Sequence, residues 1–262
     1  MKKVLLVFLT LALSLCAFGC NQPGETFTEV PEADRAETLS TFVNDEQPLT
    51  MGFSNDVRVY LKVTSSDGTA TEGVVADMKF MGTGTNVKVF AEMKGIQNDV
   101  QTVLSVLAID GTYIYAASPI DSEGNLAKVK VPYTPEMAEE MGIPDAMTAI
   151  SSALNYMSEI ELDPDDAEFM ATIGKMEISG KAGADRSLRL TISETDADLG
   201  MAGNMVLTMK FNAENKVVGI AMTATIATTA DDVTETQYIE VAIEKCTGIA
   251  FPSFADYVEQ VA

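Results

Sequence analysis

Residues 57–64 read VRVYLKVT, and this stretch decides the fold class. Its aliphatic side chains, Val57, Val59, Leu61 and Val63, alternate with polar or amphipathic ones. A period of two puts successive side chains on opposite faces of a β-strand, so the stretch predicts a strand with one apolar face and one solvated face. Sheets with a solvated face are typically antiparallel.

The same alternation recurs on both sides of this stretch. Asp110-Gly111 separates two such runs as a hairpin signal. Further strands are expected at 74–81, 86–94, 102–109, 112–116 and 128–131, and a second set at 175–180, 187–193, 204–211, 217–228 and 236–245. Because no crossover helix alternates with these strands, they predict antiparallel meanders. The two sets are not a sequence repeat, and one sheet or two similar half-sheets both fit the pattern.

Between the two sets of strands, the pattern changes to that of helices over about residues 134–173. Pro135 suits the first turn of one helix, Pro144 that of a second, and Asp163 precedes a third. A helix is also expected after Pro31. Ser253 has the spacing of a capping box and predicts a small amphipathic helix at the end of the chain.

Methionine is abundant in this helical segment. The chain has 15 methionines, and unbranched thioether side chains suit apolar surfaces that repack around variable ligands. Simple filling of the core is the alternative for each of them. The candidate ligand-binding residues are Met137, Met141, Met147, Ile150, Leu154, Met157 and Met170.

The first residues have the pattern of a secretory signal over 1–19. Lys2 and Lys3 precede an apolar run from Val4 to Phe18, and small Gly19 comes just before Cys20. The run has about 15 residues, fewer than the roughly 20 that a membrane-spanning helix needs.

Residues 17–20, AFGC, resemble a bacterial lipobox, in which the cysteine is acylated and becomes the mature N-terminus. An ordinary signal peptide, with Cys20 as a bystander, is the alternative. Lipidation at Cys20 would hold the protein on the cell membrane, facing outside the cytoplasm, without spanning it. Residues 20–30, which include Pro23 and Gly24, are expected to form a short tether.

The composition excludes several classes of function. The chain of 262 residues has no His and no Trp, and its 39 acidic against 17 basic side chains give a net charge of −22. Without histidine there is no Ser-His-Asp or Cys-His catalysis. The acidic excess argues against nucleic-acid binding. Paired carboxylates could serve a glycosidase, but in so acidic a chain they have little specificity.

No cofactor, metal site or enzymatic activity is therefore expected. The acidic run from Glu159 to Glu168 lacks the loop pattern of a calcium site, and helix capping already accounts for its aspartates. Loss of Lys2 and Lys3 with the signal would take the net charge from −22 to −24. Anionic headgroups would repel such a chain, so membrane attachment should rest on the Cys20 lipid.

These features together resemble the LolA/LolB-like superfamily, which includes lipoprotein carriers and LppX/LprG-like lipoproteins. The hairpin at 110–115, DGTYIY, is similar to one common among them. The likeness covers about residues 31–262, as the architecture of a single domain. It implies an α+β fold in which a strongly curved antiparallel sheet, a half-barrel, holds acyl chains under helices that cover its concave face. An envelope sensor or protein-interaction lipoprotein on the same fold is the alternative.

Overall fold

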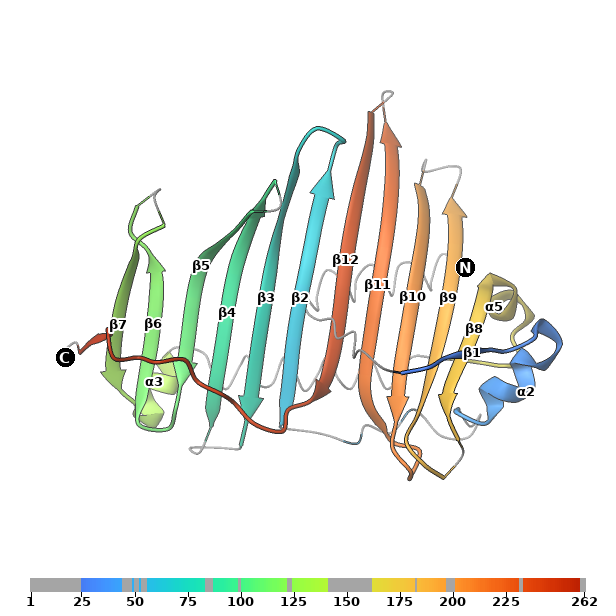
Figure 1. Cartoon of the computed structure of the whole chain (residues 1–262), viewed down its shortest axis with the longest axis horizontal. Coiled ribbons are helices and arrows are strands. Elements are labelled where there is room, and N and C mark those ends of the chain that lie inside the picture. Colours follow the sequence, from blue (N-terminus) through green and yellow to red (C-terminus); the bar gives the residue numbers. More distant parts are fainter. Residues whose placement is uncertain are drawn as a thin grey trace.

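The computed structural model describes residues 25–43, 49, 52, 56–82, 87–98, 100–121, 124–140, 162–181, 183–196, 201–230 and 233–259. These residues form one large, open β-sheet with a few short helices beside it (Figure 1). The predicted large antiparallel sheet is confirmed, and its form fits a curved sheet.

The described residues contain thirteen strands. In chain order the strands are β1 Thr28–Glu29, β2 Val57–Ser66, β3 Thr71–Met81, β4 Lys88–Gln97, β5 Val100–Ile109, β6 Tyr113–Pro119, β7 Leu126–Pro132, β8 Ile173–Gly180, β9 Arg186–Asp196, β10 Met201–Phe211, β11 Val217–Ala230, β12 Val233–Lys245 and β13 Val258–Glu259. The helices are the 3-10 helix η1 Glu32–Asp34 and the α-helices α2 Arg35–Ser40, α3 Pro135–Glu140 and α5 Ala167–Thr172.

The two predicted sets of strands are two meanders of a single sheet. The spatial order is β1-β8-β9-β10-β11-β12-β2-β3-β4-β5-β6-β7-β13. The meanders join where β12 pairs with β2, in register from Thr236↔Ser66 to Lys245↔Val57. Of the two arrangements that the sequence left open, the single sheet is therefore the correct one. The edge strands β1 and β13 were not predicted.

The hairpin between β5 and β6 turns at Asp110, as its sequence predicted. The Asp110 carboxylate accepts hydrogen bonds from the backbone nitrogens of Thr112 (2.7 Å) and Tyr113 (2.9 Å) and from the hydroxyl of Tyr115 (2.9 Å). Desolvation acts to raise the pKa of Asp110, but these hydrogen bonds outweigh it and hold that pKa below its usual value.

We expect Asp110→Asn to reduce the loss of stability on acidification. Because the folded-state pKa of Asp110 is lowered from 3.8, its carboxylate stabilises the fold above the unfolded pKa, and this contribution is lost as the pH falls through the folded pKa. Urea unfolding at about pH 7 and about pH 3 measures the effect. The wild-type protein should lose more stability over that interval than the variant, and equal losses would contradict the assignment.

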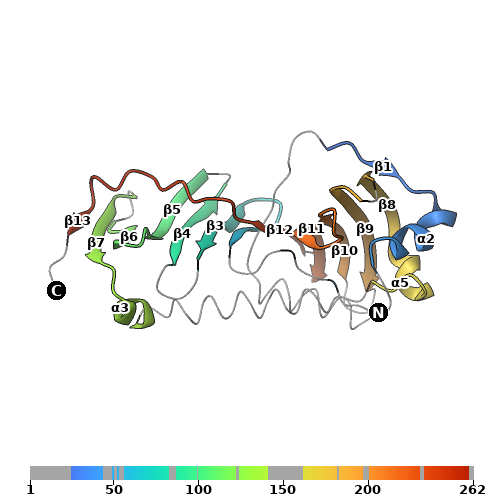
Figure 2. The ribbon, with the colours of Figure 1, turned by 90° about the horizontal axis from the view of Figure 1, so that it is seen from below.

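The short helices begin close to the predicted positions, although the 3-10 helix η1 separates Pro31 from α2. α2 follows Pro31, α3 starts at Pro135, and the Asp166 carboxylate caps α5 by accepting hydrogen bonds from the backbone nitrogens of Glu168 and Phe169. Figure 2 shows α3 beside β7 and α5 beside β8, at opposite ends of the sheet and on the same side of it. The helix expected after Pro144 lies outside the described residues.

The C-terminal segment is not the amphipathic helix that the spacing around Ser253 predicted. A turn at residues 255–256 leads instead to β13, which runs parallel to β7. Phe254 stacks on Tyr115 with ring centroids 3.9 Å apart, and Tyr257 meets Tyr115 edge-on at 5.6 Å. A helix of fewer than about 12 residues is marginal in water, so aromatic packing and strand pairing outweigh the helical signal. The segment crosses the side of the sheet opposite α3 and α5 (Figure 2).

Candidate functional site

The sheet has one apolar face and one polar face, because the alternation of side chains runs through its strands. In β2, the buried side chains Val57, Val59 and Leu61 belong to one face, and Arg58 and Lys62 to the other. The main hydrophobic cluster is built from the apolar face and includes residues of both meanders. The apolar face therefore needs a cover, whereas the polar face can meet water.

One cross-strand row of the apolar face shows how its exposure changes across the sheet. The row runs through Met176, Leu190, Leu207, Met222, Val241, Leu61, Ala76 and Met93. Leu190 on β9 is 0% exposed, Leu61 on β2 is 6% exposed, and Met93 on β4 is 39% exposed. In this row the side chains are therefore buried from β8 to β2 and partly exposed on β3 and β4, whereas the row of the same face through Phe80 and Val89 stays buried.

The neighbouring row repeats this change. It runs through Leu188, Met209, Ile220, Ile243, Val59, Met78, Ala91, Leu107 and Ala116. Side chains from Leu188 to Val59 are buried, and those from Met78 onward are partly exposed. We call the partly exposed apolar side chains of the two rows the open patch. The open patch consists of Ala76, Met78, Ala91, Met93, Leu107 and Ala116.

The open patch suits an apolar guest. Met78 and Met93 have unbranched, polarizable side chains that adjust to irregular shapes, and the alanines leave shallow space between them. Its six side chains carry no charge and no nucleophile. The patch can exclude water from an apolar chain, but it offers no group for acid-base or covalent chemistry.

Two of the predicted ligand-binding methionines lie in the described residues. Met137 and Met170 are partly buried and pack against the hydrophobic cluster. Met170 lies on α5, which contacts β8 and β9, where the apolar face is buried, so the structure does not bring it to the open patch. Met137 lies on α3, which follows β7 at the open end. The other candidates, Met141, Met147, Ile150, Leu154, Met157 and the anchor residue Cys20, lie outside the described residues.

The strand residues of the open patch are not among the predicted site residues. The signal that could have found them is the alternation of alanine and methionine at Ala76, Met78, Ala91 and Met93, where β9 holds leucine or isoleucine at its inward positions. Exposure itself depends on which segments cover each half of the sheet. The strand sequences do not contain that information.

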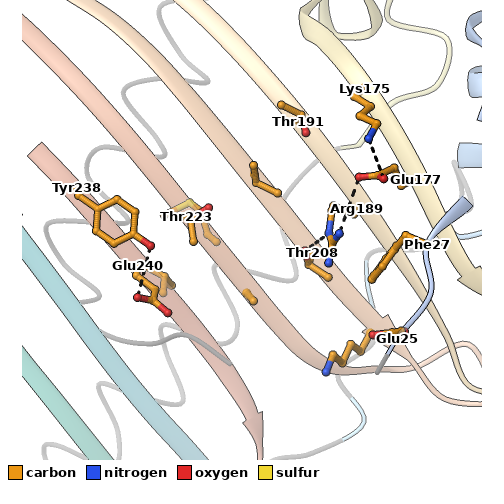
Figure 3. Close-up of a pocket in the computed structure, with 15 residues that line it drawn as sticks. Glu25, Phe27, Lys175, Glu177, Arg189, Thr191, Thr208, Thr223, Tyr238 and Glu240 are labelled. Carbon is orange, nitrogen blue, oxygen red and sulfur yellow. Dashed lines mark hydrogen bonds and ion pairs between the residues drawn. The ribbon is translucent and has the colours of Figure 1, made fainter. Parts of the chain in front are cut away.

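The polar face carries a groove of about 420 Å³ over β8–β12 (Figure 3). Its floor holds the smaller side chains of β10 and β11, which are Val206, Thr208, Ala221 and Thr223. One wall is formed by the segment before β1 together with β8 and β9, and it includes Glu25, Phe27, Lys175, Glu177 and Arg189. The opposite wall is formed by Tyr238 and Glu240 of β12.

Arg189 is the centre of the first wall. Its guanidinium lies over the ring of Phe27, 3.6 Å from the ring centroid. Its Nε is 3.5 Å from the Thr208 hydroxyl oxygen, and a terminal nitrogen is 3.9 Å from the Glu177 carboxylate. Lys175 lies closer to that carboxylate, at 2.9 Å. The wall therefore combines a stacked guanidinium with a paired ammonium and carboxylate (Figure 3).

The ionisation of two further groups is set by their surroundings. Burial acts to raise the pKa of Glu25, but hydrogen bonds from Ser179 and Ser187, with the charges of Lys210 and Arg189, lower it overall. Burial, followed by the charge of a nearby glutamate, raises the pKa of Tyr238. At neutral pH the groove therefore holds an ionised Glu25 and a neutral Tyr238.

In the part of the chain that the structure describes, the acidic run forms local turns and a helix cap. No group of three or more His, Cys, Asp or Glu side chains there could hold a metal ion. In the acidic run, Asp163 accepts a hydrogen bond from the backbone nitrogen of Asp165, and Asp166 caps α5. None of the described helices has both the length and the apolar character to cross a membrane.

Comparison with known proteins assigns this chain to no family. No family model matches it, and neither does any curated protein. Among solved structures, the S-type phycobiliprotein lyase CPES from Guillardia theta is similar over 73% of this chain and 87% of its own length, with 7% identity and a TM-score of 0.19. A likeness this weak carries no conclusion about this chain.

Proposed function

We propose that this chain is an exported, lipid-anchored binding protein that holds or transfers an acyl-chain ligand in the cell envelope without catalysing a reaction. The change in exposure along one apolar row, from Leu190 at 0% to Met93 at 39%, carries this proposal. Covering exposed apolar surface contributes about 25 cal/mol per Å². A contiguous patch of such side chains therefore favours an apolar occupant.

The helical segment supplies a cover for that occupant. α3 and α5 lie at opposite ends of the sheet, and Met137 and Met170 pack against the apolar cluster. Residues 141–161 connect these two helices. In the proposal, helices cover the apolar face, as the LolA-like resemblance implies, and an acyl chain lies between them and the open patch; residues 141–161 lie outside the described residues.

We expect the protein to take up a fluorescent long-chain fatty acid, and Met93→Glu to weaken that uptake by at least about tenfold, because a carboxylate beside the alkyl chain would have to be desolvated. Met93 is partly exposed, so the substitution should leave the fold intact. Fluorescence titration of the two proteins measures the effect.

Val100→Glu is the matched control. Val100 is 66% exposed on β5 and lies outside the open patch, so its replacement should leave uptake unchanged. Native mass spectrometry of protein purified from the envelope should also find bound lipid. An absence of both uptake and co-purified lipid would refute acyl binding, and equal effects of the two variants would refute its location.

Membrane attachment in this proposal rests on Cys20. The net charge of −22 disfavours attraction to anionic headgroups, so a covalent lipid has to supply the anchor. We expect Cys20→Ala to move the protein from the membrane fraction to the soluble exported fraction, as an immunoblot of the separated fractions would show. Unchanged fractionation would rule out the anchor.

A partner protein is the second candidate occupant. Val100 and Ile120 are each 66% exposed and lie near the ends of β5 and β6. An acyl chain on the open patch would not explain why these two apolar side chains are exposed. An envelope sensor or interaction lipoprotein would use both side chains together with the patch. A photo-crosslinker at position 100 that captures one defined envelope protein, from a chain that carries no lipid, would favour this alternative.

A further inference from the structure

We propose that the groove on the polar face binds a zwitterionic phosphate ester, a phosphate that carries an ammonium group a few bonds away. The groove and the open patch lie on opposite faces of the sheet, so they are separate sites. Three features of the groove support this ligand class: a stacked arginine on one wall, a tyrosine with a glutamate on the other, and a floor of small side chains between them.

The phosphate end of the ligand is assigned to Arg189. Arg58, on the same face, is held by two carboxylates at 3.1 and 3.0 Å. Arg189 has a looser pair with Glu177, at 3.9 Å, and stacks on Phe27. A guanidinium that lies flat on a ring directs its N–H donors outward in its own plane, which suits bidentate binding of an oxyanion. The hydroxyl of Thr208, 3.5 Å from Nε, adds a polar group at the floor.

The ammonium end is assigned to the opposite wall. The Tyr238 hydroxyl and the Glu240 carboxylate lie 3.5 Å apart on β12. Lys62, which faces Glu240 in register, places its ammonium over the Tyr238 ring, 5.6 Å from the centroid, so this wall already holds one ammonium group of the chain. A carboxylate next to an aromatic ring is a combination that an ammonium group fits.

The charge balance of the groove favours a zwitterion over a simple anion. Its basic side chains are Lys175, Arg189 and Lys210, and its acidic ones are Glu25, Glu177 and Glu240. Arg189 would attract a simple anion, but the three carboxylates, two of them on the same wall as Arg189, would repel it. A zwitterion meets opposite charge at each end.

The two walls are offset along the strands. In register, Arg189 lies across β10 and β11 from Ala242 on β12, and Glu240 and Tyr238 lie two and four residues further along that strand. At about 4.8 Å per strand and about 3.4 Å per residue, the backbones that carry Arg189 and Glu240 lie about 16 Å apart. Small side chains of β10 and β11 form the floor between the walls, which leaves space there for a ligand.

The position of the groove relative to Cys20 indicates a source for the ligand, a step that rests on the lipid anchor of the proposed function. Glu25 and Phe27 line the groove. Glu25 follows Cys20 by five residues, which reach at most about 17 Å when extended. An anchored chain would therefore hold the groove close to phospholipid headgroups, and ethanolamine headgroups have the required chemistry. Free phosphoethanolamine carries the same phosphate and ammonium groups.

Calorimetric titration of the exported protein with phosphoethanolamine, inorganic phosphate and ethanolamine tests the ligand class. We expect phosphoethanolamine to bind at least about tenfold more tightly than either fragment. Co-sedimentation of the Cys20→Ala protein with phosphatidylethanolamine or phosphatidylglycerol vesicles then separates the sources. Binding to phosphatidylethanolamine vesicles would identify a lipid headgroup as the ligand. Binding of soluble phosphoethanolamine without vesicle binding would identify a free phosphate ester.

Two variants test the walls separately. Arg189→Gln should weaken phosphoethanolamine and phosphate alike by about tenfold or more, and Glu240→Gln should weaken phosphoethanolamine but not phosphate. Arg58→Gln, which removes an arginine of the same face outside the groove, should leave both affinities unchanged. Circular dichroism of each variant verifies that it is folded.

Three results would overturn the proposal: no binding of phosphoethanolamine, equal binding of inorganic phosphate, or affinities that Arg189→Gln and Glu240→Gln leave unchanged. Failure here is distinguishable from failure of the proposed function. Fatty-acid uptake should be unaffected in Arg189→Gln, and phosphoethanolamine binding should be unaffected in Met93→Glu.

Discussion

Leu190→Ala should destabilise the protein by about 2–5 kcal/mol, because it deletes a fully buried side chain and leaves a cavity. Met93→Ala should cost about 1 kcal/mol or less, because this side chain is already 39% exposed. Leu190 and Met93 belong to the same cross-strand row of the apolar face. The two variants therefore compare one position in each meander at the same level along the strands. Urea unfolding followed by far-UV circular dichroism measures both free energies.

Because Leu190 is buried and Met93 is partly exposed, Leu190→Ala should lower the free energy of unfolding far more than Met93→Ala does. Equal, large costs would mean that position 93 is as well covered as position 190 in solution, and the open patch would then not exist. Saturating fatty acid should also stabilise the wild-type protein against urea, because a ligand that binds only the folded state shifts the equilibrium toward it.

Gly180→Ala should be the second strongly destabilising change, at about 2–5 kcal/mol. Gly180 ends β8 with a φ of +79°, and an added Cβ would lie 2.3 Å from the backbone oxygen of Asp185 and 2.8 Å from the Cα of Arg186. A positive φ costs an L-residue about 1–2 kcal/mol. Forcing a methyl group against backbone atoms of the paired strand costs about 1–3 kcal/mol more.

Gly183→Ala is the control from the same hairpin. Gly183 has almost the same φ, +80°, but no heavy atom lies within 4 Å of its Cβ position. Its replacement should therefore cost only the conformational part, about 1–2 kcal/mol. Thermal or urea unfolding of the two variants separates the two contributions, and equal losses would show that the hairpin relieves the contact by moving.

Much of the strand structure could be predicted because its signals are local. The alternation at 57–64 lies within one strand, and Asp110 hydrogen-bonds to its own turn at Thr112 and Tyr113. The eleven strands predicted between residues 57 and 245 all occur, as β2–β12. The predicted helix after Ser253 is wrong because distant rings decide that segment: Phe254 stacks on Tyr115.

The candidate sites were harder to predict. Met137 and Met170 both lie at apolar positions of predicted helices. α5 nevertheless places Met170 against β8 and β9, where the apolar face of the sheet is buried. Arg58 and Arg189 occupy equivalent polar positions in alternating strands. Only cross-strand register gives Arg58 two carboxylate partners, one of them 186 residues away, and places Arg189 on Phe27 in the groove.

The sequence by itself determined which residues form strands, which side chains share a face, and that those strands run antiparallel, because a period of two and the turn residues act over a few neighbouring positions. Only the tertiary structure decided that β12 pairs with β2 to merge the meanders, that Leu190 is buried while Met93 is not, and that side chains of both charges line a groove on the polar face. Those outcomes depend on contacts between residues far apart in the chain.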